Sequence, residues 1–324
     1  MNKEMRKILR RKIGFFVLVF FTRLGARMPL SWSYRIGSVT GQLAFRLLKR
    51  HRRTAISGLT TAFPEWDEAR IRRTAKASFV HMAQSSWEML YYLDDQQALD
   101  RIHVEGLEHL DAAQARGRGV IIVSAHLGNF PLMSLRLSRL GYPIYVVARP
   151  MRDEQTGVYM QKLRDASGVR TILSYPRRAC VTGILQALRN QSVVWMQMDQ
   201  NFGTGGVWVR FFGKLAATPA GPVTMALRTK AAVVPGYLFR DPVRNTHTLR
   251  LLPAEELQET EDRDKTVLVN VMRFTSMIES WIRLFPEQWG WVHRRWKARP
   301  NEKVRKEKYR VEDQLEEKSI VNAE

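Results

Sequence analysis

Cysteine, long apolar runs and the familiar nucleotide and metal motifs are scarce or missing in this sequence of 324 residues. Its only cysteine, Cys180, excludes an intrachain disulfide and a cysteine-cluster metal site, and it fits a reducing compartment. The apolar run at 13–21 is too short to span a bilayer, which takes roughly 20 residues. There is no Walker sequence, nucleophile elbow or zinc-binding helix motif, and the glycine-rich stretch at 203–206 precedes an expected strand, unlike a nucleotide-binding loop.

Acidic residues are also in short supply, at 31 against 52 lysines and arginines, which gives a formal net charge of +21. An excess of this size indicates an anionic partner, which could be nucleic acid, an acidic carrier protein or the anionic face of a membrane. We expect no nucleic-acid partner, because no recognised nucleic-acid module is present and aromatic residues cluster beside a membrane-like N-terminus. Hydrophobic residues make up 45% of the chain, which is typical of a globular protein.

The N-terminal apolar run has basic residues on both sides. They are Lys3, Arg6, Lys7, Arg10, Arg11 and Lys12 before the run and Arg23 and Arg27 after it. Basic flanks favour a segment that lies in the cytoplasmic interface of a membrane over one that crosses it. A cleaved signal peptide is not favoured, because no small-residue cleavage site follows the run. The alternative is a buried N-terminal helix of a soluble protein.

Hydrophobic periodicity divides the chain into three regions. Residues 1–100 are predicted to be a membrane-associated helical region, with helices over 30–50 and 68–92. Residues 101–300 are predicted to form one continuous domain with this region. In them strands alternate with helices, the last of which is expected over 264–285. The strands are expected at 119–125, 143–148, 192–198, 207–212, 233–239 and 248–252. This alternation predicts an α/β fold with a mixed, largely parallel central sheet flanked by helices. The charged tail, 301–324, is expected to be disordered.

His126 directly follows an apolar strand, at the position where open α/β sheets place their chemistry. Gly128 and Asn129 permit a tight turn, and a helix is expected over 130–140 with Asn129 as its N-cap. Free amides near Gly128 and Asn129 could hold an oxyanion, and a neutral imidazole can remove a proton from a hydroxyl. A structural histidine is the alternative.

Three segments around this histidine and after it form an ordered set of motifs. They are SAHLGNF at 124–130, WVRFFG at 208–213 with TPAGP at 218–222, and PEQWGWVHRRWK at 286–297. Together they resemble the lipid A biosynthesis acyltransferase family of bacterial lauroyl and myristoyl transferases. The resemblance implies an inner-membrane enzyme that moves an acyl chain from a carrier-protein thioester to a glycolipid hydroxyl, with no metal or redox cofactor.

The chain departs from the family pattern at one position, because the pattern places Glu or Asp where this sequence has Pro131. Asp199 is the candidate replacement, since it also follows an apolar strand and parallel strands end at one edge of a sheet. Asp199 and Gln200 also match an acidic-Gln pair of the family. Alternatively, Asp199 caps a turn with Asn201 and Gly203, or His126 works without a carboxylate.

Further polar residues of these motifs are candidate substrate-binding residues. The resemblance assigns Arg149 and Arg164 to donor or acceptor phosphates, for which a guanidinium fork is well suited, although a solvated surface role is the alternative. Arg294 and Arg295 alternate with aromatic residues, a pattern typical of a lipid headgroup interface, and a basic segment packed on the core is the alternative. Thr218 is interpreted as a helix N-cap before a proline. Arg210 and Thr218 complete the set through their motifs.

The mechanism that this pattern favours is direct transfer of an acyl chain from carrier protein or coenzyme A to a hydroxyl. An acyl-enzyme is not required, because Ser124 lies within a strand and Cys180 has no base nearby in the sequence. The acceptor could also be a lysophospholipid or another glycolipid, since fold and motif are shared more widely than substrate. Because the motif carboxylate is absent, a catalytically weak relative that binds acyl glycolipid or a membrane partner is the alternative.

Overall fold

A computed structural model describes residues 5, 12–16, 19, 20, 22, 24, 28–151 and 153–300 of the chain. The predictions for the tail 301–324 and for most of the basic residues that flank the apolar run fall outside these residues. Among the described residues, no helix is both long and apolar enough to cross a membrane.

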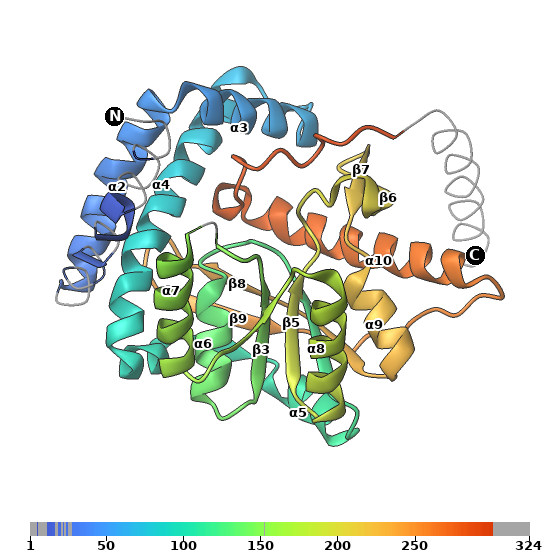
Figure 1. The fold of residues 1–324 in the computed structure, drawn as a ribbon. Helices are drawn as coiled ribbons and strands as arrows, with labels where there is room; N and C mark the ends of the chain where they lie inside the picture. Colours follow the sequence, from blue (N-terminus) through green and yellow to red (C-terminus); the bar gives the residue numbers. More distant parts are fainter. Residues whose placement is uncertain are drawn as a thin grey trace.

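A seven-stranded sheet forms the centre of the molecule (Figure 1). Its strands in spatial order are β1 (His103–Glu105), β9 (His247–Leu251), β8 (Ala232–Arg240), β2 (Val120–Ser124), β5 (Val193–Gln197), β3 (Ile144–Ala148) and β4 (Arg170–Leu173). The five strands from β8 to β4 are parallel, whereas β9 runs antiparallel to β8 and carries β1 beside it. The predicted α/β fold with a mixed, largely parallel sheet is therefore confirmed.

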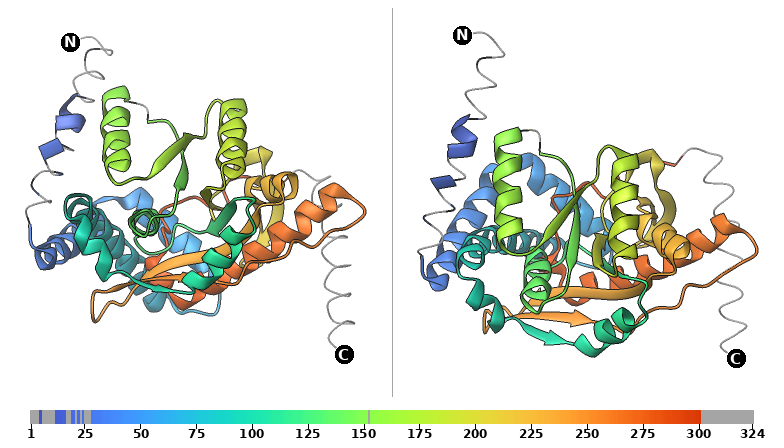
Figure 2. Two further views of the ribbon diagram at one scale, coloured as in Figure 1. Left: turned by 90° about the horizontal axis from the view of Figure 1, so that it is seen from below. Right: turned by 60° about the horizontal axis from the view of Figure 1, so that its bottom comes forward.

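Both faces of the sheet are covered by helices, as Figure 2 shows. Alternate residues of β2 enter different hydrophobic clusters, because successive side chains of a strand point to opposite faces. Ile121 and Val123 pack in one cluster, whose helices are α8 (Arg177–Arg189), α9 (Gly221–Thr229) and α10 (Arg263–Leu284). Val120 and Ile122 pack in the other, with α5 (Leu107–Ala115) and α6 (Pro131–Arg139). A strand buried on both faces gives the continuous apolar run seen in the sequence.

The N-terminal helices pack onto this core and onto one another. They are α2 (Leu30–Leu47), α3 (Lys49–Ala62) and α4 (Glu68–Asp94). The single helix expected over 30–50 is divided at Leu48. There the Arg52 guanidinium donates hydrogen bonds to the carbonyls of Phe45 and Arg46 at 3.0 Å each. Gly37 and Gly41 let α2 approach α4 closely, since a Cβ on either glycine would lie 2.5 Å from an α4 backbone carbon.

The remaining elements are short. They are the helix α7 (Glu154–Ala166), the hairpin β6 (Val207–Phe211) and β7 (Lys214–Thr218), and the 3₁₀ turns η1 (Gln96–Arg101), η2 (Gly203–Gly205) and η3 (Pro286–Gln288). All six expected strands are present within one residue at each end, and β1, β4 and β7 were not expected. Strands as short as β1, with three residues, lack the length at which alternation becomes a signal.

Candidate active site

His126 and Asp199 lie side by side because they follow neighbouring parallel strands. Ser124 of β2 pairs with Gln197 of β5, so the residues two positions further along each chain meet at the carboxyl edge of the sheet. His126 Nδ1 lies 2.8 Å from Asp199 Oδ1, and the His126 amide donates to Asp199 Oδ2 at 3.0 Å. The predicted proximity of the two residues is confirmed, and the carboxylate binds His126 instead of capping a turn with Asn201.

Asp199 is held ionised although its side chain is fully buried. Burial raises the pKa of this carboxyl, but the adjacent His126 and a hydrogen bond from Trp289 outweigh burial and lower its pKa to about 2. Trp289 Nε1 donates to Asp199 Oδ2 at 2.7 Å. An ionised acceptor at Nδ1 fixes the proton of a neutral imidazole on that nitrogen and leaves Nε2 as the basic atom. The imidazole is 26% exposed, so Nε2 has access to a substrate.

The turn after His126 is built differently from the sequence prediction. The helix begins at Pro131 with Phe130 at the N-cap position, and the Asn129 side chain donates to α4 instead of capping α6. Gly128 has φ +62° and its amide donates to the Gln288 carbonyl at 3.0 Å, so that amide is not available to an oxyanion. A Cβ on Gly128 would lie 2.2 Å from the Leu238 carbonyl, which explains the glycine.

A groove of about 920 Å³ lies beside this edge of the sheet. Its cationic lining residues are Arg149, Arg177, Arg294 and Lys297, and no described Asp or Glu lines it. Arg149 and Arg294 were expected to contact substrate, and the structure brings these two together. Arg177, at the start of α8, was missed because nothing in the sequence indicates that its helix begins at this groove.

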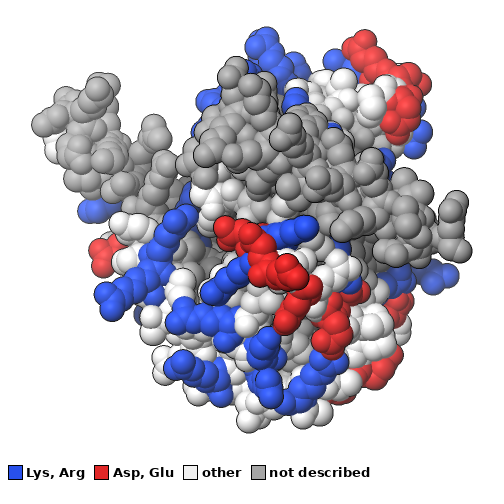
Figure 3. All heavy atoms as spheres, turned by 90° about the vertical axis from the view of Figure 1, so that its right-hand side faces the viewer, with Lys and Arg blue, Asp and Glu red and all other residues white. Residues whose placement is uncertain are grey.

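Charge is arranged differently elsewhere on the surface. The face drawn in Figure 3 carries acidic side chains among the basic ones. Several surface cations outside the groove are paired, for example Arg116 with Glu256 at 2.8 Å and Lys230 with Glu259 at 3.1 Å. Among the described residues, the lining of the groove thus carries basic side chains and no acidic ones, as an anionic ligand requires.

The groove is lined by the His293 imidazole and not by that of His126. The sequence placed His293 only within the aromatic and basic segment. Its Nε2 accepts a hydrogen bond from the Asn201 amide at 2.9 Å, so a neutral His293 carries its proton on Nδ1. Burial lowers the pKa of His293, and the charge of Asp199 opposes that shift only in part. A neutral imidazole with an Nδ1 donor therefore lines the groove.

Arg295 and Thr218 were predicted to bind substrate, but their side chains are buried and contact each other. For Arg295 this agrees with the alternative prediction of a basic segment packed on the core. The Arg295 side chain is 1% exposed, donates to the Ala217 carbonyl at 2.7 Å and to Thr218 Oγ1, and lies over the Phe211 ring. Burial lowers the pKa of Arg295 to about 10. Its guanidinium fixes the β6–β7 hairpin and cannot reach a lipid headgroup. Thr218 ends β7, and the N-cap of α9 is Ala220.

Three further candidates are not gathered at the groove. Arg164 near the end of α7 donates to Thr171 Oγ1 at 2.8 Å, toward the amino edge of β4, so it lies across the sheet from His126. Arg210 on β6 donates to the Gly213 carbonyl at 3.2 Å. Gln200 is half-buried next to Asp199. No cluster of three or more His, Cys, Asp or Glu that could hold a metal occurs among the described residues.

Comparison with known proteins agrees with this geometry. The family model described as bacterial lipid A biosynthesis acyltransferase matches residues 2–298. The chain belongs to this family. The resemblance drawn from the three motifs is confirmed, and a member of this family is an acyltransferase.

Individual relatives of this lipid A acyltransferase family member are moderately similar. The lipid A biosynthesis lauroyltransferase of Escherichia coli (strain K12) is 28% identical over 86% of this chain and 89% of its own length. The palmitoleoyltransferase of the same organism is 27% identical over 86% of this chain and 89% of its own length. A phosphatidylinositol mannoside acyltransferase of Mycobacterium tuberculosis is 32% identical over 44% of this chain and 45% of its own length.

Proposed function

We propose that this acyltransferase moves a fatty acyl chain from an acyl carrier protein thioester, or from acyl-CoA, to a hydroxyl of a lipid A precursor or related glycolipid. The observation that carries the proposal is the His126–Asp199 pair at the exit of two neighbouring strands, 2.8 Å apart and opening on solvent through the imidazole. The pair supplies a general base with a fixed tautomer.

In this mechanism His126 Nε2 takes the proton of the acceptor hydroxyl as its oxygen attacks the thioester carbonyl. The new C–O bond forms, the C–S bond breaks, and the proton passes from the imidazolium to the departing thiolate. Asp199 stabilises the imidazolium between these steps. We assign two donors to the oxyanion, the backbone N–H of Asn129, which has no acceptor among the described residues, and the Nδ1–H of His293.

The cationic groove suits the phosphates of donor or acceptor. Arg149 and Arg294 are exposed on its walls, and guanidinium groups bind phosphate in a bidentate manner. Replacing Arg294 by Gln should raise KM for a phosphorylated acceptor several-fold and reduce its dependence on salt. Arg164→Gln, across the sheet, is the matched control and should leave KM unchanged.

The same proposal places the enzyme on the cytoplasmic face of the bacterial inner membrane. The outer side of α2 exposes Trp32, Val39, Leu43 and Leu47 by half or more of their surfaces. Between Glu4 and Glu65 the sequence has thirteen lysines and arginines and no acidic residue. An apolar helix face in a wholly cationic segment is suited to anionic headgroups.

The experiment is acyl transfer by the purified, detergent-solubilised protein, from acyl carrier protein and CoA thioesters to a tetraacylated lipid A precursor and, in parallel, to a lysophospholipid. His126→Ala should lower turnover at least about a hundredfold, which is the lower range for loss of a general base. His103→Ala, at an exposed imidazole on β1, is the control. Transfer to the lysophospholipid alone would correct the acceptor, and lipid binding without transfer to either would identify a non-catalytic relative.

A further inference from the structure

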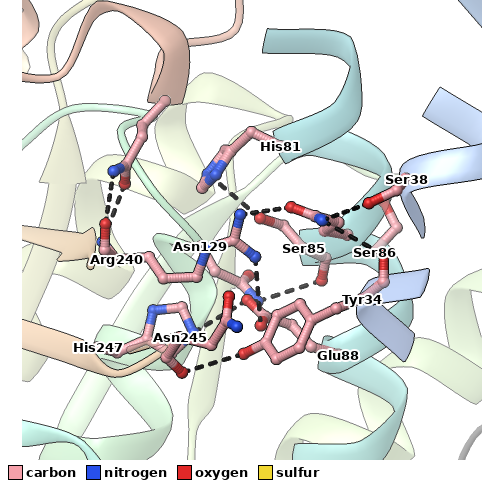
Figure 4. Close-up of polar contacts among 12 residues, drawn as sticks. Tyr34, Ser38, His81, Ser85, Ser86, Glu88, Asn129, Arg240, Asn245 and His247 are labelled. Atoms are coloured by element: carbon pink, nitrogen blue, oxygen red, sulfur yellow. Dashed lines mark hydrogen bonds and ion pairs between the residues drawn. The ribbon is translucent and has the colours of Figure 1, made fainter. Parts of the chain in front are cut away.

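A buried polar cluster includes Glu88, Asn129, Arg240 and His247 (Figure 4). Asn129 belongs to the turn that follows His126, so this cluster contacts that turn. On the basis of the proposed function, we propose that Glu88 of α4, acting through the Asn129 side chain, is a positioning residue for His126. Neither Glu88 nor Asn129 is one of the groups that exchange the proton. Both set where the imidazole stands.

The Asn129 side chain makes a direct contact between the turn and α4. Asn129 Nδ2 donates to the Ser85 carbonyl at 3.1 Å and to Glu88 Oε1 at 2.9 Å. Both partners lie on the same helix, and Asn129 itself is 3% exposed. The amide thus uses both of its N–H groups on α4, three residues after His126.

Glu88 is a charged anchor for this amide. Its side chain is fully buried, with His247 Nε2 at 3.0 Å and Arg240 Nη1 at 3.9 Å. Burial raises the pKa of Glu88, but His247 and Arg240 outweigh it and lower the pKa to about 2. An ionised acceptor holds an amide donor more tightly than a neutral one does.

The same cluster reaches the turn by a second route. The Gln288 side chain accepts from the Arg240 amide at 2.9 Å and donates to the Arg240 carbonyl at 2.7 Å. The Gln288 carbonyl then accepts from the Gly128 amide at 3.0 Å. Gly128 and Asn129 are therefore held by two separate elements, β8 through Gln288 and α4 directly.

Such fastening matters because transfer requires the base and the hydroxyl within hydrogen-bond reach. Loss of an ångström of precision at a catalytic group can lower the rate about a hundredfold without contact to substrate. Glu88 is sealed from the groove, so its effect has to appear in kcat and not in substrate binding.

The chain offers a closely matched control for Asn129. Asn270 of α10 is fully buried, and its Nδ2 donates to the carbonyls of Gln258 and Thr266 at 2.8 Å each, far from His126 in sequence and element. Asn129→Ala should lower kcat about ten- to a hundredfold with KM within about twofold of the wild type, while Asn270→Ala retains kcat. Equal kcat losses in the two variants would overturn the proposal.

The conservative variant at Glu88 tests the charge of the acceptor. Glu88→Gln retains an amide oxygen to which Asn129 Nδ2 can donate, whereas Glu88→Ala removes the acceptor altogether. Glu88→Ala should therefore lower kcat more than Glu88→Gln does, with KM within about twofold of the wild type in both. A kcat equal to that of the wild type in Glu88→Ala would contradict the pair.

A spectroscopic readout separates this proposal from the proposed function. The His126 Nδ1–H proton, assigned by its disappearance in His126→Ala, should give a downfield NMR signal through its bond to Asp199. Asn129→Ala should broaden or shift that signal and Asn270→Ala should not. An unchanged signal in Asn129→Ala would overturn the positioning role even if no acceptor were turned over, whereas failed transfer with the expected shift would reject only the proposed function.

Discussion

Two carboxylate–imidazole pairs with similar N···O distances occur among the described residues, His126 with Asp199 and His247 with Glu88. The first pair is hydrogen-bonded, whereas His247 Nε2 lies near Glu88 without hydrogen-bond geometry. The closest N···O distances are 2.8 Å and 3.0 Å, and both carboxylates are fully buried. The difference is in the imidazoles, since the side chain of His126 is 26% exposed and that of His247 is not exposed at all. Pairing alone therefore does not distinguish the proposed catalytic base from His247, whereas exposure of the imidazole does.

The elements that carry the pairs explain this difference. His126 follows β2 at the carboxyl edge, where the chain leaves the sheet and the imidazole meets solvent. His247 begins β9 and faces inward, against Tyr92 at a centroid distance of 6.1 Å and beside Arg240. The Arg240 guanidinium lies 3.9 Å from Glu88, whereas the hydrogen-bond partners of Asp199 among the described residues are the His126 ring, the His126 amide and the Trp289 indole. In the proposed mechanism the charge of Asp199 can therefore stabilise an imidazolium that forms and disappears.

Breaking the His126–Asp199 pair, which we call the open pair because its imidazole is exposed, should give the largest effect on activity. Asp199→Asn retains the shape of the side chain but offers a poorer acceptor to His126 Nδ1, so the imidazole loses both its tautomer and the charge that stabilises its protonated form. Turnover should fall at least about a hundredfold. Steady-state kinetics on folded protein would test this, and an unchanged kcat would show that His126 works alone.

Breaking the His247–Glu88 pair, which we call the sealed pair because both side chains are fully buried, should mainly lower stability. His247→Leu leaves the fully buried Glu88 with one polar partner fewer, and loss of one partner of a buried pair typically costs about 3–5 kcal/mol. The free energy of unfolding should fall by that amount in urea titrations, while kcat per folded molecule changes less than tenfold. A hundredfold loss of kcat at unchanged stability would reverse the contrast between the pairs.

Much of the fold could be predicted because its central strands are buried on both faces. An apolar run such as 120–124, bounded by glycine and a polar turn, indicates a strand regardless of what packs on it. The proximity of Asp199 to His126 could be predicted, because alternating strands and helices indicate a parallel sheet, and parallel strands end at one edge of that sheet. The neighbouring positions of β2 and β5, which make the contact direct, are a property of topology and not of either strand.

The side chains that turned out differently were misplaced for a shared reason. Asn129 and Thr218 have the residue types of helix caps, and Arg295 stands in a basic, aromatic segment typical of a lipid interface. Local pattern gives each a local role. Tertiary contacts override these local roles, because the Asn129 side chain donates to α4 and the Arg295 guanidinium donates to the β6–β7 hairpin. His293 was missed since its role depends on Asn201, which is distant in sequence.

The sealed region can be probed further through His81, which is 4% exposed beside Ser85. Burial, aided by Arg240, lowers the pKa of His81 to about 3, so the folded protein keeps it neutral while the unfolded chain binds a proton below about pH 6.5. Stability should therefore fall as the pH drops from 7 to 5, by about 2 kcal/mol for this group. His81→Gln should remove that part of the dependence in urea titrations at the two pH values. An identical dependence in the variant would place the effect elsewhere, for instance on His293, whose pKa is also lowered.

The smallest effect should come from Trp289, which holds the open pair from the side. Trp289→Phe retains a buried ring but removes the Nε1 donor to Asp199 Oδ2, leaving the carboxylate with its two bonds from His126. We expect kcat to fall about tenfold, in line with about 1.5 kcal/mol for a hydrogen bond to a charged group. Trp291→Phe is the matched control, because that indole is equally buried and donates to the Pro286 carbonyl at 2.6 Å, away from either carboxylate. Equal kcat values in the two variants would mean that His126 alone orients Asp199. The His126–Asp199 pair would then need no third residue, unlike the His247–Glu88 pair, which has Arg240 beside it.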